Sequence, residues 1–162
     1  MISLRRPTPG LVARLSLSLT LLAAMPVVGS PAAAQTPGRT IEITGSDDMK
    51  YSVTTINAKP GEALHIRLSA KGAMPKIAMS HNIVILKPKT DVQAFATAAA
   101  NARATNFVPP ALKDEVIAAS TLVGNGETTD LKFTAPKAPG TYPFICTFPG
   151  HFLTMKGTLV VK

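Results

Sequence analysis

The chain has only one cysteine, Cys146, no tryptophan and three histidines in 162 residues. A single cysteine excludes a disulfide within the chain and any dinuclear metal centre bridged by two thiolates. Three histidines are too few for a catalyst with a second, histidine-rich metal site. A lone thiol is either a small core residue or a protected ligand or nucleophile, and its neighbours in the sequence decide between these readings.

Acidic residues are also scarce, at nine against seventeen lysines and arginines. Arg5, Arg6 and Arg14 belong to the N-terminal segment discussed next, and without them the remainder carries a net charge of +5. The basic residues are scattered, and they form no block interleaved with aromatic residues. This pattern argues against a nucleic-acid-binding face and is compatible with an acidic partner.

The first 35 residues have the pattern of a secretory signal peptide. A basic start precedes the almost wholly apolar run 11–28, and Ala32 and Ala34 form an A-x-A pattern of the kind found at signal-peptide cleavage sites. The alternative, a retained membrane anchor, is less favoured because the apolar run after Arg14 is short for a span of about 20 residues. We therefore predict that residues 1–35 are removed, that 36–162 form one exported domain, in the periplasm, and that no stable membrane insertion remains after cleavage.

Residues 36–162 break into short alternating runs separated by glycine and proline turns, which predicts an all-β sandwich or barrel of seven to eight antiparallel strands. The expected strands are 40–44, 51–57, 63–69, 81–86, 116–120, 130–134, 141–147 and 158–161.

One segment departs from the strand pattern. Residues 90–103 place apolar side chains at helical intervals, and Thr90 or Asp91 is suited to cap the start. We predict one helix there, inserted between strands and packed on the sandwich. The segment 106–113, which contains two adjacent prolines, is expected to be a loop.

Three soft ligand types lie within ten residues of one another near the C-terminus. Cys146, His151 and Met155 form a Cys-x4-His-x3-Met pattern around a proline-glycine turn. A thiolate, an imidazole and a thioether together suit copper, which cycles between two oxidation states. His81, at the head of an apolar run, can supply a second imidazole.

Each of these residues taken singly has a structural explanation. A lone buried cysteine is usually a small hydrophobic residue, a methionine near a strand usually fills core space, and a lone histidine is usually satisfied structurally. Their joint occurrence on one turn of a predicted β protein, with a second histidine on a strand, favours copper.

Two motifs resemble the azurin family, and more loosely the auracyanins. They are MSHN at 79–82 and CTFPGHFLTMKG at 146–157, and the resemblance extends over nearly all of 40–162. The ten-residue spacing of the ligands is its specific part. The resemblance implies a Greek-key cupredoxin β-sandwich with the helix as an inserted flap, and one type 1 copper ion.

The resemblance also assigns roles to individual residues. His81, Cys146 and His151 would bind the copper ion equatorially, with Met155 as a long axial ligand and the backbone carbonyl of residue 80 as a weak contact. Residue 80 is Ser80, where azurins usually have glycine. Asn82 would connect the two ligand segments by hydrogen bonds, and Thr147, next to the cysteine, is assigned to the same supporting role.

The function expected from these features is single-electron transfer outside the cytoplasm, with no catalysed reaction. Partners would be redox proteins such as c-type cytochromes or membrane-bound oxidoreductases, which would dock on an apolar rim near His151. The rim residues are Met74, Met79, Pro149 and Phe152. A copper enzyme is rejected because only His65 remains for a second site. The alternative function is a copper-binding or storage protein without a carrier role, although no exposed Met- or His-rich tract is present.

Overall fold

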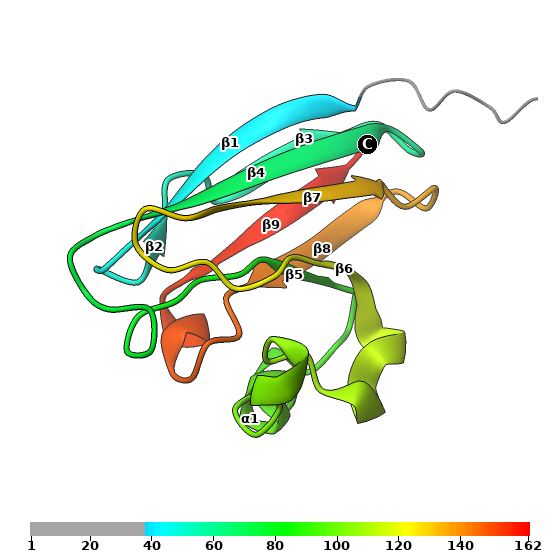
Figure 1. Cartoon of the computed structure of the whole chain (residues 1–162). Helices are drawn as coiled ribbons and strands as arrows, with labels where there is room; N and C mark the ends of the chain where they lie inside the picture. Colours follow the sequence, from blue (N-terminus) through cyan, green and yellow to red (C-terminus); the bar gives the residue numbers. More distant parts are fainter. Residues whose placement is uncertain (1–37) are drawn as a thin grey trace, which may run out of the picture. The chain divides into compact units, whose positions relative to one another are not determined.

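The computed structural model describes residues 38–162, which form two packed β-sheets with one α-helix at their lower edge in the view of Figure 1. The sheets have the strand orders β2-β1-β4-β7 and β3-β9-β8-β5-β6. The strands are β1 (Arg39–Ser46), β2 (Lys50–Tyr51), β3 (Thr55–Ala58), β4 (Ala63–Lys71), β5 (Val84–Leu86), β6 (Val116–Ala119), β7 (Thr128–Thr134), β8 (Gly140–Ile145) and β9 (Lys156–Val161). The expected all-β sandwich with one inserted helix is confirmed for these residues, but it has nine strands rather than seven to eight, because the expected strand 51–57 is divided into β2 and β3. The predicted signal peptide, 1–35, lies outside them.

The alternation of β4 shows why the sandwich forms. Its side chains at Leu64, Ile66 and Leu68 are buried between the sheets, whereas His65 and Arg67 face outward. Side chains on successive strand residues point to opposite faces, so this pattern buries one face of the sheet and leaves the other in contact with solvent. The buried face packs against apolar side chains of the second sheet, which together make the main core.

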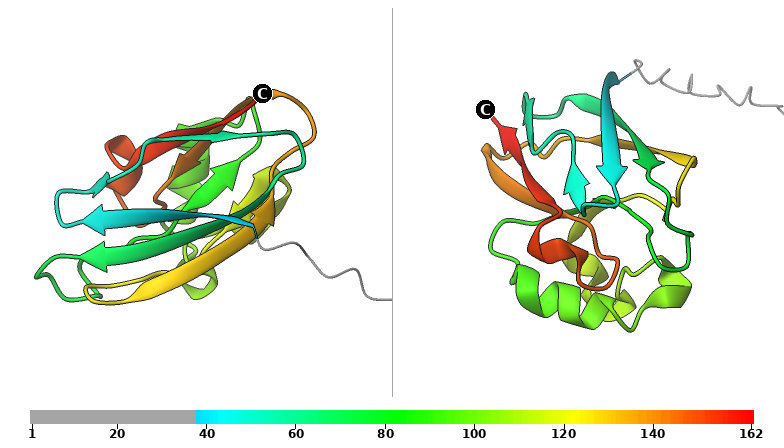
Figure 2. Two further views of the ribbon diagram at one scale, coloured as in Figure 1. Left: turned by 90° about the horizontal axis from the view of Figure 1, so that it is seen from above. Right: turned by 90° about the vertical axis from the view of Figure 1, so that its left-hand side faces the viewer.

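Strand β5 is buried on both of its faces, which explains its unbroken apolar sequence. Ile85 belongs to the core between the sheets, while Val84 and Leu86 belong to a second apolar cluster with the helix α1 (Val92–Ala99). We call the segment 90–109, which contains α1, the flap. In the right-hand view of Figure 2, α1 (green) lies below the strands of the sandwich. The helix thus covers a sheet face that would otherwise be exposed to water.

Several expected strands have different bounds in the structure, and three of the differences concern changes of sheet or the candidate site. Residues 51–57 are not one strand, because β2 pairs with β1 in the first sheet and β3 pairs with β9 in the second. The expected strand 81–86 is regular only from Val84, and His81 instead forms an isolated bridge with Val123. Strand β8 ends at Ile145 rather than at residue 147. These differences arise where the chain passes from one sheet to the other or enters the candidate site.

The expectation of a purely antiparallel sandwich is wrong. Strands β1 and β4 pair in parallel, and so do β3 and β9. A parallel pair requires a connection that crosses over to the same end of the sheet. Here each crossover passes through the opposite sheet, and no local turn signal in the sequence reveals it.

The helix is shorter than predicted. Asp91 caps its start by accepting a hydrogen bond from the backbone N–H of Ala94, as expected, but the helix ends at Ala99. Beyond it the backbone tightens into i→i−3 bonds, and the chain turns so that Phe107 is buried in the flap cluster. Short 3₁₀ helices follow at η1 (Arg103–Thr105) and at η2 (Pro110–Glu115), the latter beginning within the segment 106–113 expected to be a loop.

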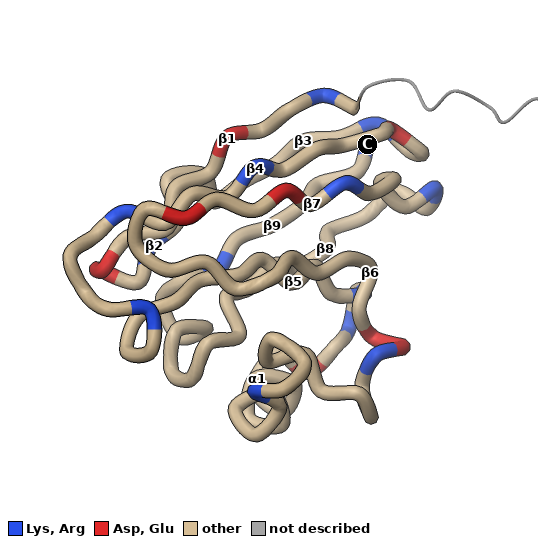
Figure 3. Tube along the Cα trace, viewed as in Figure 1, with Lys and Arg blue, Asp and Glu red and all other residues tan. Residues whose placement is uncertain are grey.

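Charged residues are spread over the strands and loops of residues 38–162, with both signs on the first sheet (Figure 3). Within these residues, no helix is long and apolar enough to cross a membrane.

Candidate metal centre

A compact loop between β8 and β9 carries three of the candidate ligands. Cys146 follows the end of β8, and its backbone N–H donates to the carbonyl of Met155 at 3.0 Å. Gly150 has a φ of 83°, in the left-handed region that favours glycine, so the chain can turn back sharply. His151 then begins the 3₁₀ helix η3 (His151–Leu153), and its carbonyl accepts from the N–H of Met155 at 2.7 Å. These backbone bonds close the loop and fix the direction of each ligand.

His81 reaches the same place from a different part of the chain. Its backbone exchanges two hydrogen bonds of 2.9 Å with Val123, which hold it three residues before the start of β5. The ring of His81 lies 5.2 Å, centroid to centroid, from the ring of His151. His81, although remote in sequence, therefore faces the loop 146–155, which we call the ligand loop.

The donor atoms of His81, Cys146 and His151 all lie within 4.8 Å of one another. The Cys146 sulfur is 3.6 Å from Nδ1 of His151. Nδ1 of His81 is buried without a hydrogen-bond partner in the described part of the chain. Because a buried polar atom is normally paired, this nitrogen is available as a ligand.

Met155 completes the group at the side of β1. A β-carbon placed on Gly45 would lie 2.8 Å from the terminal methyl of Met155 and 2.9 Å from Cδ2 of His81. Both side chains therefore pack directly on the backbone of Gly45. All four candidate ligands are buried, with at most 3% of their surface exposed.

Burial sets the protonation of the site. Desolvation, helped by the neighbouring His81, lowers the pKa of His151 from 6.5 to about 4. It also lowers the pKa of His81 from its ordinary value, against the opposing charge of Asp47. Burial raises the pKa of the Cys146 thiol to about 11. Two neutral imidazoles, a thiol and a thioether, with no carboxylate among them, fit a soft ion such as copper and disfavour Mg²⁺ and Ca²⁺.

The carbonyl of Ser80 faces the site. Its oxygen lies 3.9 Å from the sulfur of Cys146, while the Ser80 hydroxyl turns away and donates to the carbonyl of Lys76. The hydroxyl of Ser80 therefore has its hydrogen-bond partner within its own loop. Metal contact by the Ser80 carbonyl stays a prediction.

Asn82 connects the ligand segments, as the resemblance implied. Its side-chain oxygen accepts from the backbone N–H of Thr147 at 2.9 Å, and its amide donates to Thr147 Oγ1 at 2.8 Å and to the carbonyl of Asn106 at 2.9 Å. Two further partners of this group were not predicted from the sequence. Asn106 joins the flap to it, and the buried hydroxyl of Tyr51 donates to the Asn82 carbonyl. Tyr51 could have been suspected from the sequence, because a tyrosine in a core strand normally needs a hydrogen-bond partner for its hydroxyl.

The proposed rim residues differ in exposure. Met74 and Pro149 are exposed and Phe152 is half-buried, but Met79 is 9% exposed and offers little surface. Two exposed apolar residues were missed, Ile77 at 71% and Leu153 at 62%. Leu153 lies in η3 with His151, so we add it to the rim.

His65 lies outside the candidate site. It stands on the outer face of the first sheet, where Nε2 is 2.6 Å from Asp130 and Nδ1 is 3.3 Å from the hydroxyl of Thr40.

Comparison with known proteins identifies the family. The family described as copper binding proteins, plastocyanin/azurin family, matches residues 39–162. The chain belongs to this family.

Individual relatives in the plastocyanin/azurin family agree with this placement. An azurin from Alcaligenes faecalis is 37% identical over 122 residues, which cover 74% of this chain and 94% of that protein. The structure is similar to auracyanin A, a "blue" copper protein from Chloroflexus aurantiacus, with a TM-score of 0.70, 35% identity, and coverage of 78% and 100% of the two chains. It is also similar to the azurin Az-iso2 of Methylomonas sp. strain J, with a TM-score of 0.67, 35% identity, and coverage of 76% and 97%.

The close packing on Gly45 gives a first prediction. The substitution Gly45→Ala is expected to displace Met155 or His81, because the new methyl would approach both within 3.0 Å. We expect a loss of about 1–3 kcal/mol in the free energy of unfolding and a changed visible spectrum of the copper-loaded protein. Ser46→Ala, at the next position of β1, serves as the control and should change neither. An unchanged spectrum in the Gly45 variant would show that the ligands do not depend on this packing.

The protonation of the site gives a second prediction. At pH 7.5 the metal-free site holds a protonated thiol and two neutral imidazoles, because the pKa of Cys146 lies near 11 and those of both histidines lie below 6.5. Binding of Zn²⁺, which accepts the same ligands, should therefore release about one proton. Below about pH 5 the release should increase as His151 begins to bind a proton in the metal-free protein. Calorimetric titration in buffers of different ionisation heat measures this number, and release of no proton at pH 7.5 would contradict thiolate ligation.

Proposed function

We propose that this protein is a type 1 copper electron carrier that catalyses no reaction itself. One copper ion would be held by Cys146, His81 and His151, with Met155 as a weaker axial ligand. The observation that carries the proposal is the convergence of these four soft side chains in one buried site. Copper supplies the one-electron chemistry, by cycling between Cu⁺ and Cu²⁺.

The residues around the ligands suit such a carrier by restricting their movement. The loop bonds from Cys146 and Met155 hold the ligand segment at both ends, and Asn82, the residue that follows His81, is hydrogen-bonded to Thr147 in the loop. Ligands that are fixed in advance do not have to rearrange when the charge of the ion changes, so the barrier to electron transfer stays low. The same burial keeps water and other small ligands out of the site.

Two alternatives find less support. A copper enzyme would need an open coordination position, and the four candidate ligands are enclosed. A storage role would favour several loosely held ions on exposed sulfur or imidazole groups. In residues 38–162, the histidine, cysteine and carboxylate side chains that come together in a metal-binding arrangement form the one group described above.

We further propose that the protein works outside the cytoplasm, in the periplasm, after removal of residues 1–35. Its partners would be c-type cytochromes or membrane-bound oxidoreductases that dock on the rim formed by Met74, Pro149, Phe152 and Leu153, with Met79 beneath it. Exposed apolar side chains near a buried redox ion suit brief encounters rather than permanent binding.

Rapid mixing with a reduced soluble c-type cytochrome tests this function. The oxidised copper-loaded protein is expected to accept one electron per chain, with a second-order rate constant on the order of 10⁵–10⁷ M⁻¹ s⁻¹, as for ordinary protein encounters. The zinc-loaded protein is the control, since zinc has no accessible redox change. Cytochrome oxidation no faster with the copper protein than with the zinc protein would refute the carrier role toward this class of partner.

A further inference from the structure

A cavity of about 640 Å³ lies beside the candidate metal centre. Four segments form its walls: the loop before His81, the flap, the connection between β6 and β7, and the ligand loop. Its lining residues are Lys76, Ile77, Ala78, Ser80, Ala100, Arg103, Phe107, Leu122, Phe148 and Pro149. A volume of this size falls in the range of small-molecule sites, which is about 300–1,000 Å³.

The floor of this cavity is aromatic and touches the metal centre. Phe107 and Phe148 pack edge to face, with ring centroids 5.4 Å apart. On its other side Phe148 packs against the ring of His151 at 4.8 Å. Ser80, which also lines the cavity, directs its carbonyl toward Cys146. A molecule in the cavity would therefore be separated from the ligand His151 by one aromatic ring.

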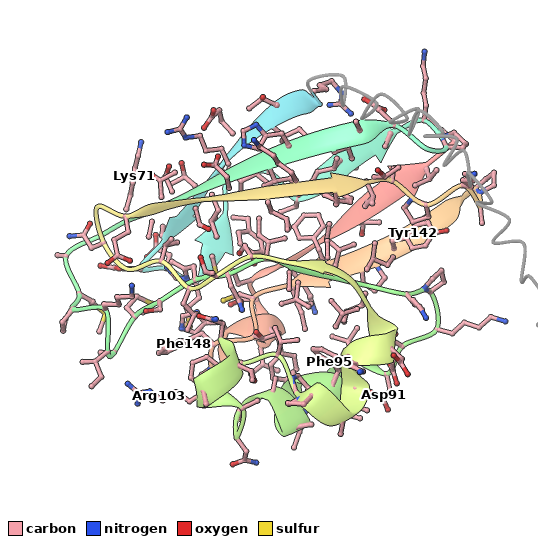
Figure 4. All side chains as sticks on the ribbon, turned by 45° about the vertical axis from the view of Figure 1, so that its right-hand side comes forward. Lys71, Asp91, Phe95, Arg103, Tyr142 and Phe148 are labelled. Carbon is pink, nitrogen blue, oxygen red and sulfur yellow. The ribbon has the colours of Figure 1, made fainter. Side chains whose placement is uncertain are left out.

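The charge of the cavity is positive. Its lining holds two cations, Lys76 and Arg103, and no carboxylate. Lys76 is already neutralised by Glu127, whose oxygen lies 2.6 Å from Nζ. Among residues 38–162, no carboxylate lies within salt-bridge distance of the Arg103 guanidinium. Figure 4 shows Arg103, on the flap, and Phe148 at the same end of the domain.

We infer that this cavity is a binding site for small amphipathic carboxylates, with an apolar, preferably aromatic, body. The body would lie on Phe107 and Phe148, and the carboxylate would pair with Arg103, whose planar fork suits a carboxylate. A partner protein is a poorer fit, because the four lining segments form a hollow of small-molecule size rather than a flat patch. The inference does not depend on the electron-carrier role.

A molecule bound in this cavity would alter the surroundings of His151 through the hydrogen bonds of Asn82 as well as through contact with Phe148. Asn82 donates to the carbonyl of Asn106 in the flap and bonds to Thr147 in the ligand loop. A molecule held between the flap and the ligand loop would touch both segments that this side chain joins. Binding should therefore be visible in the signals of His151.

Titration of the reduced, copper-loaded protein with 2-naphthoate tests the inference, because the Cu⁺ form is diamagnetic and gives sharp NMR signals. We expect saturable shifts of the backbone amides of Ile77, Ala78 and Phe107 and of the His151 ring, with a Kd of about 1 mM for a ligand of this size. The neutral analogue 2-naphthylmethanol should bind about tenfold more weakly, because it cannot pair with the guanidinium.

Three variants define the site. Arg103→Gln should weaken naphthoate binding about tenfold and leave the binding of the neutral analogue unchanged. Lys113→Gln, a cation of η2 that does not line the cavity, is the matched control and should have an effect of less than about twofold. Ala100→Phe, at an exposed position on the cavity wall, should block both molecules. The proposal is overturned if naphthoate causes no saturable shift at these residues, if Arg103→Gln binds it as tightly as the unaltered chain does, or if both probes bind equally.

Discussion

Replacing Cys146 with serine is expected to abolish the intense visible absorption of the copper-loaded protein. The colour of a type 1 site comes from charge transfer between the thiolate and copper, and a serine hydroxyl supplies no such transition. Cys146 is fully buried at the end of β8, and no other cysteine is present in the chain to replace it. Absorption spectra at equal copper content measure the effect.

The matched variant for this experiment is Met155→Leu. It removes the other sulfur of the site while keeping a side chain of similar volume, so the core should tolerate it. We expect it to keep copper and colour and to raise the reduction potential, because a drier site with one donor fewer disfavours the more charged oxidised ion. A Cys146→Ser variant that stayed intensely blue, or a colour that depended on Met155 instead, would overturn the ligand assignment.

The second large effect is expected on electron self-exchange. The substitution Leu153→Glu places a carboxylate on an exposed side chain two residues from His151. In self-exchange two copies would meet through this surface, so each encounter would bring together two unpaired charges and remove them from water. We expect the exchange rate between the Cu⁺ and Cu²⁺ forms, measured by NMR line broadening, to fall about ten- to a hundredfold.

A matched charge elsewhere separates local from general effects. Thr141 is exposed near the start of β8, about 16 Å along the strand from Cys146 at the usual rise per residue. Thr141→Glu should therefore have a small effect that fades as salt is added, because only long-range repulsion acts there. The slow exchange of the Leu153 variant should persist at high salt. Equal rates for the two variants at every ionic strength would exclude the rim as the route for electrons.

The ligand loop could be predicted from the sequence because its information is local. Cys146, His151 and Met155 lie within ten residues, and the turn between them is specified by a proline and a glycine. His81 is different, since only the resemblance and a predicted strand connected it to the loop. The bridge to Val123 that places it depends on tertiary structure.

Other features could not be predicted because burial and pairing are decided far along the chain. Met79 resembles an exposed rim residue in sequence, but it is buried, whereas Ile77 and Leu153 are exposed. The parallel pairing of β1 with β4 and of β3 with β9 depends on crossovers between the sheets. The cavity beside Phe148 likewise requires four segments that the sequence does not show to be neighbours.

Coulometric titration of the copper-loaded protein tests the central claim most directly. The site described here predicts one copper ion per chain and one electron per chain in each direction, with bleaching on reduction and full return of colour on oxidation. Because all four candidate ligands are buried and their segments are tied by hydrogen bonds, the ion should stay bound through repeated cycles against a competing chelator. Release of copper on reduction, or uptake of several ions per chain, would contradict the carrier role and favour storage.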